Sequence, residues 1–165
     1  MRISTRSRYG LRMVLDIAVN GQSSPVRIHD VAARQGLSVK YLEKLIRILK
    51  DHGFILSKRG PRGGHMLALP QEDLHIGNIV SALEGDRHII DCTADPQCCE
   101  AQNSCPTRKL WDNAARSMFD TLNAVSVADM VKEISRADGL PSGPATDPTL
   151  SETKIAMADP VDAAS

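Results

Sequence analysis

The sequence predicts a mainly α-helical protein with one small β-hairpin, and three observations lead to this fold class. The chain has 165 residues, of which 42% are hydrophobic and 24% charged, which suits one globular domain. Apolar residues recur at helical spacing in several segments. Two short strand-like runs enclose a turn rich in Gly, Pro and Arg. Aromatic residues make up only 3% of the chain, so we expect a core built mainly from Leu, Ile, Val, Ala and Met.

The first two helices are expected at residues 6–20 and 28–35. The first carries an apolar face, formed by Tyr9, Met13, Val14, Ile17 and Ala18. Gly21 interrupts that pattern, and a loop with the sequence Ser-Ser-Pro follows. The second helix is short, and Gly36 is well placed to be its left-handed C-terminal cap.

A third helix and a hairpin follow. Ser38 is expected to cap a helix over 39–51, in which apolar residues recur at i, i+3, i+4 and i+7, namely Leu42, Leu45, Ile46 and Leu49. Gly53 ends this helix. Residues 54–58 and 65–69 predict two short strands, joined by the tip Arg-Gly-Pro-Arg-Gly-Gly.

Three more helices are expected after the hairpin. The first, at 76–84, has Ile76, Ile79, Val80 and Leu83 on one side. The second, at 107–125, is long and has an apolar stripe of Trp111, Ala114, Ala115, Met118, Leu122 and Val125. Ser126 is expected to cap the last helix, which turns Val127, Met130, Val131 and Ile134 inward. Residues 138–165 have four Pro and no aromatic residue, so we expect a disordered tail.

The second and third helices have the spacing of a helix-turn-helix. Ala32 is small enough for the two helices to approach closely, Gly36 permits the tight turn, and Leu42 buries the second helix against the first. The third helix is then expected to turn a polar face outward, made of Lys40, Tyr41, Glu43, Lys44, Arg47 and Lys50. Such a face can enter the major groove of duplex DNA.

The hairpin and the charge distribution favour the same function. The hairpin forms a wing whose tip carries Arg59 and Arg62 among three glycines, and an arginine there can enter a narrow minor groove. The whole chain has no net charge, but residues 1–65 hold 13 Lys and Arg against four Asp and Glu, a net charge of +9. Residues 66–165 carry −9. The first half is therefore expected to bind a polyanion, double-stranded DNA.

Several segments resemble a known family. They are Met1-Arg2-Ile3-Ser4, Arg8-Tyr9, Leu15-Asp16, Arg34-Gln35-Gly36-Leu37-Ser38, Tyr41-Leu42-Glu43 and Arg59-Gly60-Pro61-x-Gly63-Gly64. Together they resemble the IscR-like, Rrf-type transcription factors, which are iron–sulfur cluster regulators, from residue 1 to about 135. The resemblance implies a homodimeric winged helix-turn-helix regulator that reads a palindromic operator and whose long helix, here 107–125, packs against its twin.

The resemblance also implies which residues contact DNA. Family members read bases through the third helix, which maps onto Lys40, Tyr41 and Lys44, with Glu43 tempering specificity, and Arg59 matches their wing arginine. Both lysines are departures, since polar uncharged residues occupy these positions in the best-known members. The full set of expected DNA-contacting residues is Ser38, Lys40, Tyr41, Glu43, Lys44, Arg47, Arg59 and Arg62.

All four cysteines lie close together, and they predict a second chemical feature. Cys92 and Cys98, like Cys99 and Cys105, are separated by five residues in a segment, 91–106, that has no helical period and is expected to be a loop. Structural zinc sites usually pair cysteines two to four residues apart, so the spacing suits an iron–sulfur cluster better. Zinc, redox-active thiols and inert thiols remain alternatives on spacing alone.

The resemblance implies a [2Fe-2S] cluster held by three cysteines and a nearby histidine. Cys92 and Cys105 match the outer two ligands, and the middle ligand is either Cys98 or Cys99, because this loop is one residue longer. Arg108 occupies the histidine position, and a guanidinium cannot ligate metal. The fourth ligand is thus open among the second member of the vicinal pair, Asp91, Glu100, His88, a group from the partner subunit and a small thiol.

The sequence disfavours several other classes of protein. No apolar run exceeds four residues, which excludes a membrane span and predicts a cytoplasmic protein. Asp16 interrupts the apolar stretch that a signal peptide would need. A cluster-free regulator that uses zinc or redox-active cysteines is the main alternative. An enzyme or electron carrier is the weaker one, because no catalytic constellation or phosphate-binding glycine loop occurs.

Domain boundaries follow from these expectations. Residues 1–84 form a DNA-binding domain, onto which 126–136 packs back. Residues 85–106 form the cluster loop, and 107–125 the dimerisation helix.

Overall fold

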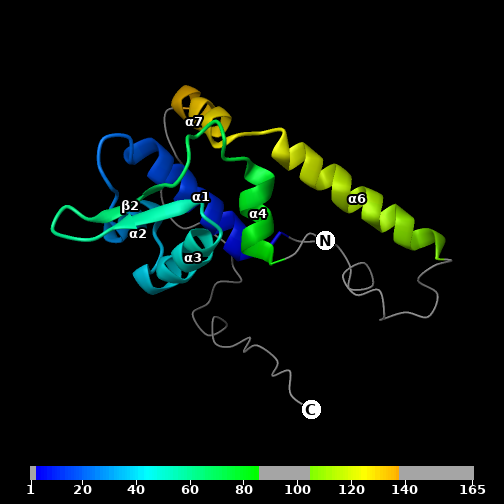
Figure 1. Cartoon of the computed structure of the whole chain (residues 1–165), viewed down its shortest axis with the longest axis horizontal. Helices are drawn as coiled ribbons and strands as arrows, with labels where there is room; N and C mark the ends of the chain where they lie inside the picture. Colours follow the sequence, from blue (N-terminus) through cyan, green and yellow to red (C-terminus); the bar gives the residue numbers. More distant parts are fainter. Residues whose placement is uncertain (1–2, 86–104, 138–165) are drawn as a thin grey trace, which may run out of the picture.

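The computed structural model describes residues 3–85 and 105–137. Its elements are α1 (Thr5–Asn20), α2 (Ile28–Gln35), α3 (Val39–Asp51), β1 (Ile55–Lys58), β2 (Gly64–Leu67), α4 (Ile76–Glu84), α6 (Pro106–Asn123) and α7 (Val127–Arg136). Figure 1 shows α1 and α4 in the middle of the molecule, with α3 on one side, α7 on the other and α6 extending away. The predicted fold class, mainly helical with one hairpin, is confirmed.

Local sequence sets the helix boundaries. The helices expected at 28–35, 39–51 and 76–84 have the same bounds in the structure. Gly36 adopts φ 63° and ends α2 in the left-handed conformation, as predicted. The long helix begins one residue earlier than expected, because Pro106 occupies its first turn, where no backbone N–H is needed.

The core surrounds α1, which is the central helix. Its largest buried side chains are Tyr9, Met13 and Ile17, and they pack with the apolar stripe of α3 and with residues of α4 such as Ile79 and Leu83. Gly10 lets α1 and α4 approach closely, since a Cβ there would lie 2.5 Å from Cδ1 of Leu83. The hydrophobic effect of this burial holds α3 against the centre of the fold.

The apolar stripe expected on α6 is only partly buried in the single chain. Ala115 and Phe119 are the buried residues of this helix, whereas Trp111 is 41% exposed and Ala114 is also exposed. The reason is that α6 packs on α4, with Phe119 in the same core cluster as the buried side chains of α4, whereas Trp111 faces solvent in the single chain. Phe119 does not belong to the expected stripe.

The start of α7 is tied to the start of α4. The N–H of Val127 donates to the carbonyl of Leu74 at 2.8 Å, and the N–H of Ile76 donates to the carbonyl of Val125 at 3.0 Å. Ser126 caps α7 as predicted, because its hydroxyl accepts from the N–H of Asp129 at 3.1 Å. The helix also packs on α1.

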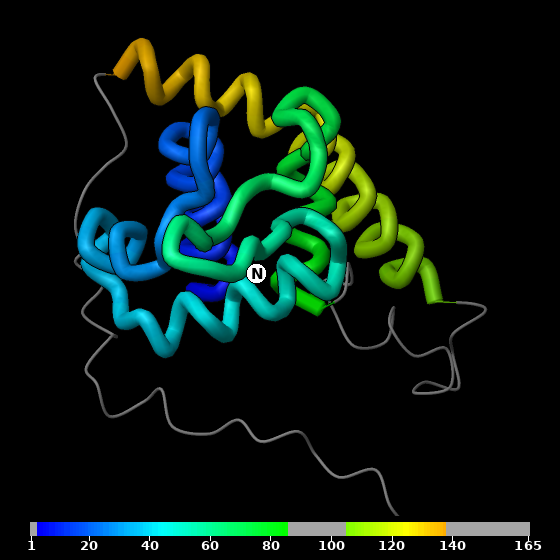
Figure 2. The backbone as a smooth tube through the Cα atoms, turned by 60° about the vertical axis from the view of Figure 1, so that its left-hand side comes forward, coloured from blue at the N-terminus to red at the C-terminus, as the bar shows by residue number. Residues whose placement is uncertain are grey.

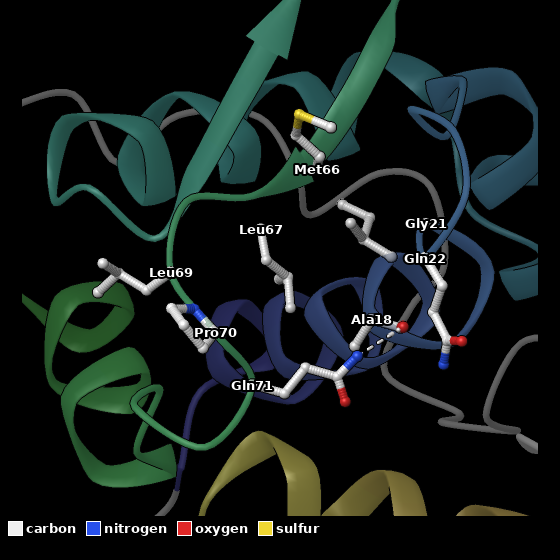
Figure 3. A pocket seen from close by; sticks show the side chains of 9 residues that line it. Ala18, Gly21, Gln22, Met66, Leu67, Leu69, Pro70 and Gln71 are labelled. Atoms are coloured by element: carbon white, nitrogen blue, oxygen red, sulfur yellow. Dashed lines mark hydrogen bonds between the residues drawn. The ribbon is translucent and has the colours of Figure 1, made fainter.

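The wing returns to the body along the end of α1. Gln71 donates from Nε2 to the carbonyl of Ala18 at 3.0 Å, and Leu67 and Leu69 lie nearby beside a shallow apolar hollow (Figure 3). This contact fixes the base of the wing on the central helix. Within the described residues, no helix is long and apolar enough to cross a lipid bilayer.

Candidate nucleic-acid interface

The outer face of α3 carries most of the expected DNA-contacting residues. Ser38 caps the helix, accepting from the N–H of Tyr41 at 3.2 Å. Its inner stripe, Leu42, Leu45, Ile46 and Leu49, is at most 5% exposed. The opposite face is exposed and holds Lys40, Glu43, Lys44, Arg47 and Lys50. Four cations and one carboxylate thus lie on a single solvent-facing surface.

Tyr41 differs from the expectation that it faces outward. Its ring is half-buried against Tyr9 of α1, in an edge-to-face arrangement with the centroids 6.1 Å apart. Burial raises the pKa of the Tyr41 phenol. The residue therefore anchors the start of α3 to α1. Helical periodicity could not predict this contact, because it shows which residues share a face of α3 but not which helix packs on that face.

The wing exposes two arginines at a tight turn. Arg59 and Arg62 are exposed, and the N–H of Gly63 donates to the carbonyl of Gly60 at 2.9 Å. Gly60 has φ 114°, which L side chains rarely adopt. A Cβ on Gly63 would lie 2.4 Å from the carbonyl oxygen of Lys58. The glycines are thus required by the turn that presents the arginines.

The wing is also paired with the segment that precedes α2, a feature that the sequence did not predict. Val26 and His65 exchange two backbone hydrogen bonds of 2.8 Å each. A Cβ on Gly64 would lie 2.5 Å from the carbonyl oxygen of Val26, so the two segments touch. Arg27 donates from Nη2 to the carbonyl of Pro61 at 3.0 Å. The only hint of this pairing in the sequence was Val26, a β-branched residue that follows Pro25.

A buried polar network joins α1 to α2. Asp16 is 1% exposed and accepts from Arg34, with its Oδ1 2.5 Å from Nη2, and from Nε2 of Gln35 at 2.9 Å. Arg12 donates from Nε to Oε1 of Gln35 at 2.9 Å. The hydrogen bond to Asp16 is the main cause that raises the pKa of Arg34. Asp16, Arg34 and Gln35 belong to segments that carry the family resemblance. Their hydrogen bonds therefore position α2, the first helix of the helix-turn-helix, on α1.

The N-terminus of α1 is attached to the end of α4. Glu84 accepts from the N–H and the hydroxyl of Ser4, both at 2.9 Å. Burial raises the pKa of Glu84, but hydrogen bonding by Ser7 and Ser4 outweighs burial, and the pKa lies below its ordinary value. Since Glu84 is the last residue of α4, this contact lies just before the cysteine segment.

Cys105 is the one predicted metal ligand within the described residues. It precedes the first turn of α6, with Sγ 3.1 Å from Oγ1 of Thr107. That hydrogen bond, together with the N–H groups of Arg108 and Thr107, lowers the pKa of the thiol. A thiolate is the form that ligates metal, so Cys105 fits a ligand role. Arg108 is half-buried one turn further on, and a guanidinium offers no lone pair to a metal.

The other candidate ligands lie outside the described residues. They are Cys92, Cys98, Cys99, Asp91, Glu100 and His88. Among residues 3–85 and 105–137, no group of three or more His, Cys, Asp or Glu side chains could hold a metal ion.

Comparisons with known proteins agree with this geometry. The family model of Rrf2, described as an iron-dependent transcriptional regulator, matches residues 3–133. Protein rrf2 of Nitratidesulfovibrio vulgaris is 47% identical over 135 residues, which cover 82% of this chain and 90% of that protein. Among solved structures, T. potens IscR has a TM-score of 0.69 and 30% identity, covering 86% of this chain and 94% of the other. CymR, the global cysteine regulator of B. subtilis, has a TM-score of 0.67 and 26% identity, with coverage of 81% and 98%.

The basic helix α3 packs on α1, α2 and α4, and a basic hairpin with a glycine-containing turn lies beside it. This arrangement defines the winged helix-turn-helix transcriptional regulators. These proteins are regulators and not enzymes. The chain belongs to the Rrf2 family of that class.

Proposed function

We propose that the chain acts as a homodimeric DNA-binding regulator whose affinity for a palindromic operator depends on a [2Fe-2S]-type iron–sulfur cluster. Cys92 and Cys105 hold this cluster together with Cys98 or Cys99. The bases are read by Lys40 and Lys44, while Arg59 enters the minor groove.

One observation carries the DNA-binding part of this proposal. The exposed cations of α3 and the exposed arginines of the wing belong to elements held together by buried contacts. Four cations on the outer face of α3 can meet base edges and phosphates, and a wing arginine favours the negative potential of a narrow minor groove. Glu43 lies among these cations. Its carboxylate repels bases that present only hydrogen-bond acceptors in the major groove, which adds to sequence specificity.

The exposed apolar side of α6 supports the homodimer. Leu110 is 60% exposed and Trp111 41% exposed, on a helix that extends away from the body of the molecule (Figure 1). A second copy packed on this side would bury both side chains. Two such copies place their α3 helices on two half-sites of one duplex, which requires a spacing of about 34 Å or a multiple of it.

The location of Cys105 supports the coupling between the thiols and the dimer. The residue precedes α6 directly, and α6 packs on α4 through a close approach in which a Cβ on Gly77 would lie 2.4 Å from Oδ1 of Asn123. An iron–sulfur cluster supplies a redox couple and coordination bonds that would tie the cysteine segment to the start of α6. A change at Cys105 then alters the angle of α6 against the winged domain, and thereby the spacing of the two α3 helices.

The first experiment compares DNA affinity with cluster content. Protein purified without oxygen is analysed for iron, sulfide and visible absorption, and duplexes are then selected from a random pool at fixed salt. We expect cluster-loaded and cluster-free protein to differ in affinity or in the duplexes chosen. Lys44→Ala should change selectivity, whereas Lys132→Ala, on α7, serves as a matched control. Equal affinities for all selected duplexes would refute the switch.

The second experiment identifies the ligands with variants that differ by one position. Cys105→Ser and Cys92→Ser should lose visible absorption and iron. Cys98→Ser and Cys99→Ser control for each other, because only the middle ligand should be sensitive; if both variants lose iron, both thiols ligate. Retention of full iron and sulfide by Cys105→Ser would refute the assigned donor set.

A second candidate function is favoured by the structural similarity to CymR, a cysteine regulator. In this alternative the chain is a regulator without an iron–sulfur cluster, and its cysteines bind zinc or are oxidised directly. Colourless protein with one zinc per chain, isolated without oxygen, would support it.

A further inference from the structure

A polar hollow lies between the wing tip and the segment that leads into α2. Its volume is about 340 Å³, and its lining includes Ser24, Arg27, Asp30 and Arg62. Figure 2 shows the wing passing beside that segment, where Val26 and His65 are paired. Two guanidinium groups from segments 35 residues apart in the sequence therefore line one cavity.

Arg27 is held in place at this hollow. Its Nη2 donates to the carbonyl of Pro61 at 3.0 Å, which spans from the segment before α2 to the tip of the wing. A guanidinium has five N–H donors, so a single bond to Pro61 leaves the group able to donate to a further acceptor. Arg27 is exposed, and the Val26–His65 pair holds the backbone beside it, so its guanidinium stays near the wing tip and remains accessible to a further acceptor.

The charges of the lining favour an anion. Arg27 and Arg62 contribute two positive charges, and the carboxylate of Asp30 offsets one of them. The Asp30 charge also acts on Arg34, whose pKa it helps to raise after the larger effect of Asp16. A phosphodiester carries one negative charge and two free oxygens, which match the fork geometry of an arginine.

We propose that Arg27 and Arg62 bind one phosphate of the DNA backbone at this hollow, and that Arg27 also positions the wing tip beside it. The proposal rests on the DNA-binding function above, and it adds Arg27, which the sequence did not mark as a DNA contact. Phosphate contacts fix the register of a protein on the duplex and are independent of base sequence. Arg27 thus sets how deeply Arg59 enters the groove without reading a base itself.

The test measures the salt dependence of affinity in the full-length dimer, using a selected duplex and an unrelated duplex. Each phosphate contact contributes about 0.9 to the slope of log affinity against log salt. Because the two arginines share one phosphate, the double variant Arg27→Met/Arg62→Met should lower that slope by about 0.9 per engaged chain, and each single variant by a part of that, equally on both duplexes. Between 50 and 200 mM salt, the loss of affinity should shrink by about 3.5-fold per engaged chain in the double variant.

Three further variants separate a phosphate contact from a purely structural role. Arg27→Lys keeps the charge and should keep the slope, even if it loosens the wing. Asp30→Asn should tighten binding at low salt. Arg136→Met removes an exposed cation of α7, on the side of the molecule opposite α3 (Figure 1), and should leave the slope unchanged. Circular dichroism melts check that every variant is folded.

The outcomes distinguish this inference from the function on which it rests. If the unaltered protein binds no duplex, the proposed function and this inference both fail. If it binds and Arg27→Met retains the full slope, only this inference fails. If the slopes are retained but inorganic phosphate stabilises the unaltered protein and not Arg27→Met, the hollow binds a free anion, and its assignment to the duplex is overturned.

Discussion

Asp16 offers the most direct test of how the helix-turn-helix is held in place. The variant Asp16→Asn keeps the size of the side chain and removes its charge. In the structure this carboxylate is 1% exposed and accepts from Arg34 and from Gln35. An amide would present an NH₂ group to one of these donors, so at least one hydrogen bond is lost and the ion pair disappears.

The expected loss of stability depends on which charge is left unpaired. Breaking a buried ion pair costs about 3–5 kcal/mol when the remaining charge stays buried. After Asp16→Asn the remaining charge belongs to Arg34, which is 38% exposed and can be hydrated, so we expect about 2–3 kcal/mol. Arg34→Met leaves the carboxylate of Asp16 buried without its cation, and should cost more, about 3–5 kcal/mol.

Urea denaturation followed by circular dichroism measures these free energies of unfolding at equal protein concentration. Glu133→Gln is the matched control, because it makes the same chemical change in an ion pair with Arg136 whose side chains are 64% and 72% exposed. It should cost about 0.5 kcal/mol or less. The reasoning is refuted if Asp16→Asn costs no more than Glu133→Gln, or if Arg34→Met costs less than Asp16→Asn.

Three further perturbations test other contacts. Gly77→Ala should lower the free energy of unfolding, measured by urea denaturation, by about 1 kcal/mol. The new Cβ clashes with Asn123, and this overpacking costs more than the higher helix propensity of alanine gains. Adding Asn123→Ala should restore most of the loss. Because the pKa of Glu84 is depressed when folded, its contribution is present above pH 4.5 and is lost as the pH falls through the lower folded value, so Glu84→Gln should flatten the acid limb of the stability curve. Burial lowers the pKa of His65, so the folded wing favours the neutral imidazole ring. The stability of the unaltered protein should therefore decline as the pH falls below 6.5, and that of His65→Gln should decline less.

The fold was largely predictable because short-range signals determine most of its elements. Helical apolar spacing located α3 and α4, Gly36 located the turn, and Ser126 located the start of α7. The face of α6 was harder to predict. Periodicity identifies an apolar stripe, but the position of α4 decides that Phe119 is buried and Trp111 exposed.

The exposure of the candidate interface residues was predictable where charge alone keeps a side chain in solvent. Lys40, Lys44 and Arg59 were expected to face solvent, and they do. The contacts of Tyr41 with Tyr9 and of Arg27 with Pro61 were not predicted, because each joins residues that are distant in the sequence. Such contacts leave no periodic trace, since they arise when two segments meet in the folded chain.

The pairing of Val26 with His65 has a mechanical consequence. A hairpin that is hydrogen-bonded to the segment before α2 moves together with that segment, so in the proposed DNA complex α3 and the wing arginines would move as one unit. In the proposed regulator, a rotation of α6 would therefore reach α3 and the wing at the same time. Release from the operator should accordingly be concerted, without a stage in which one of the two has left and the other remains seated.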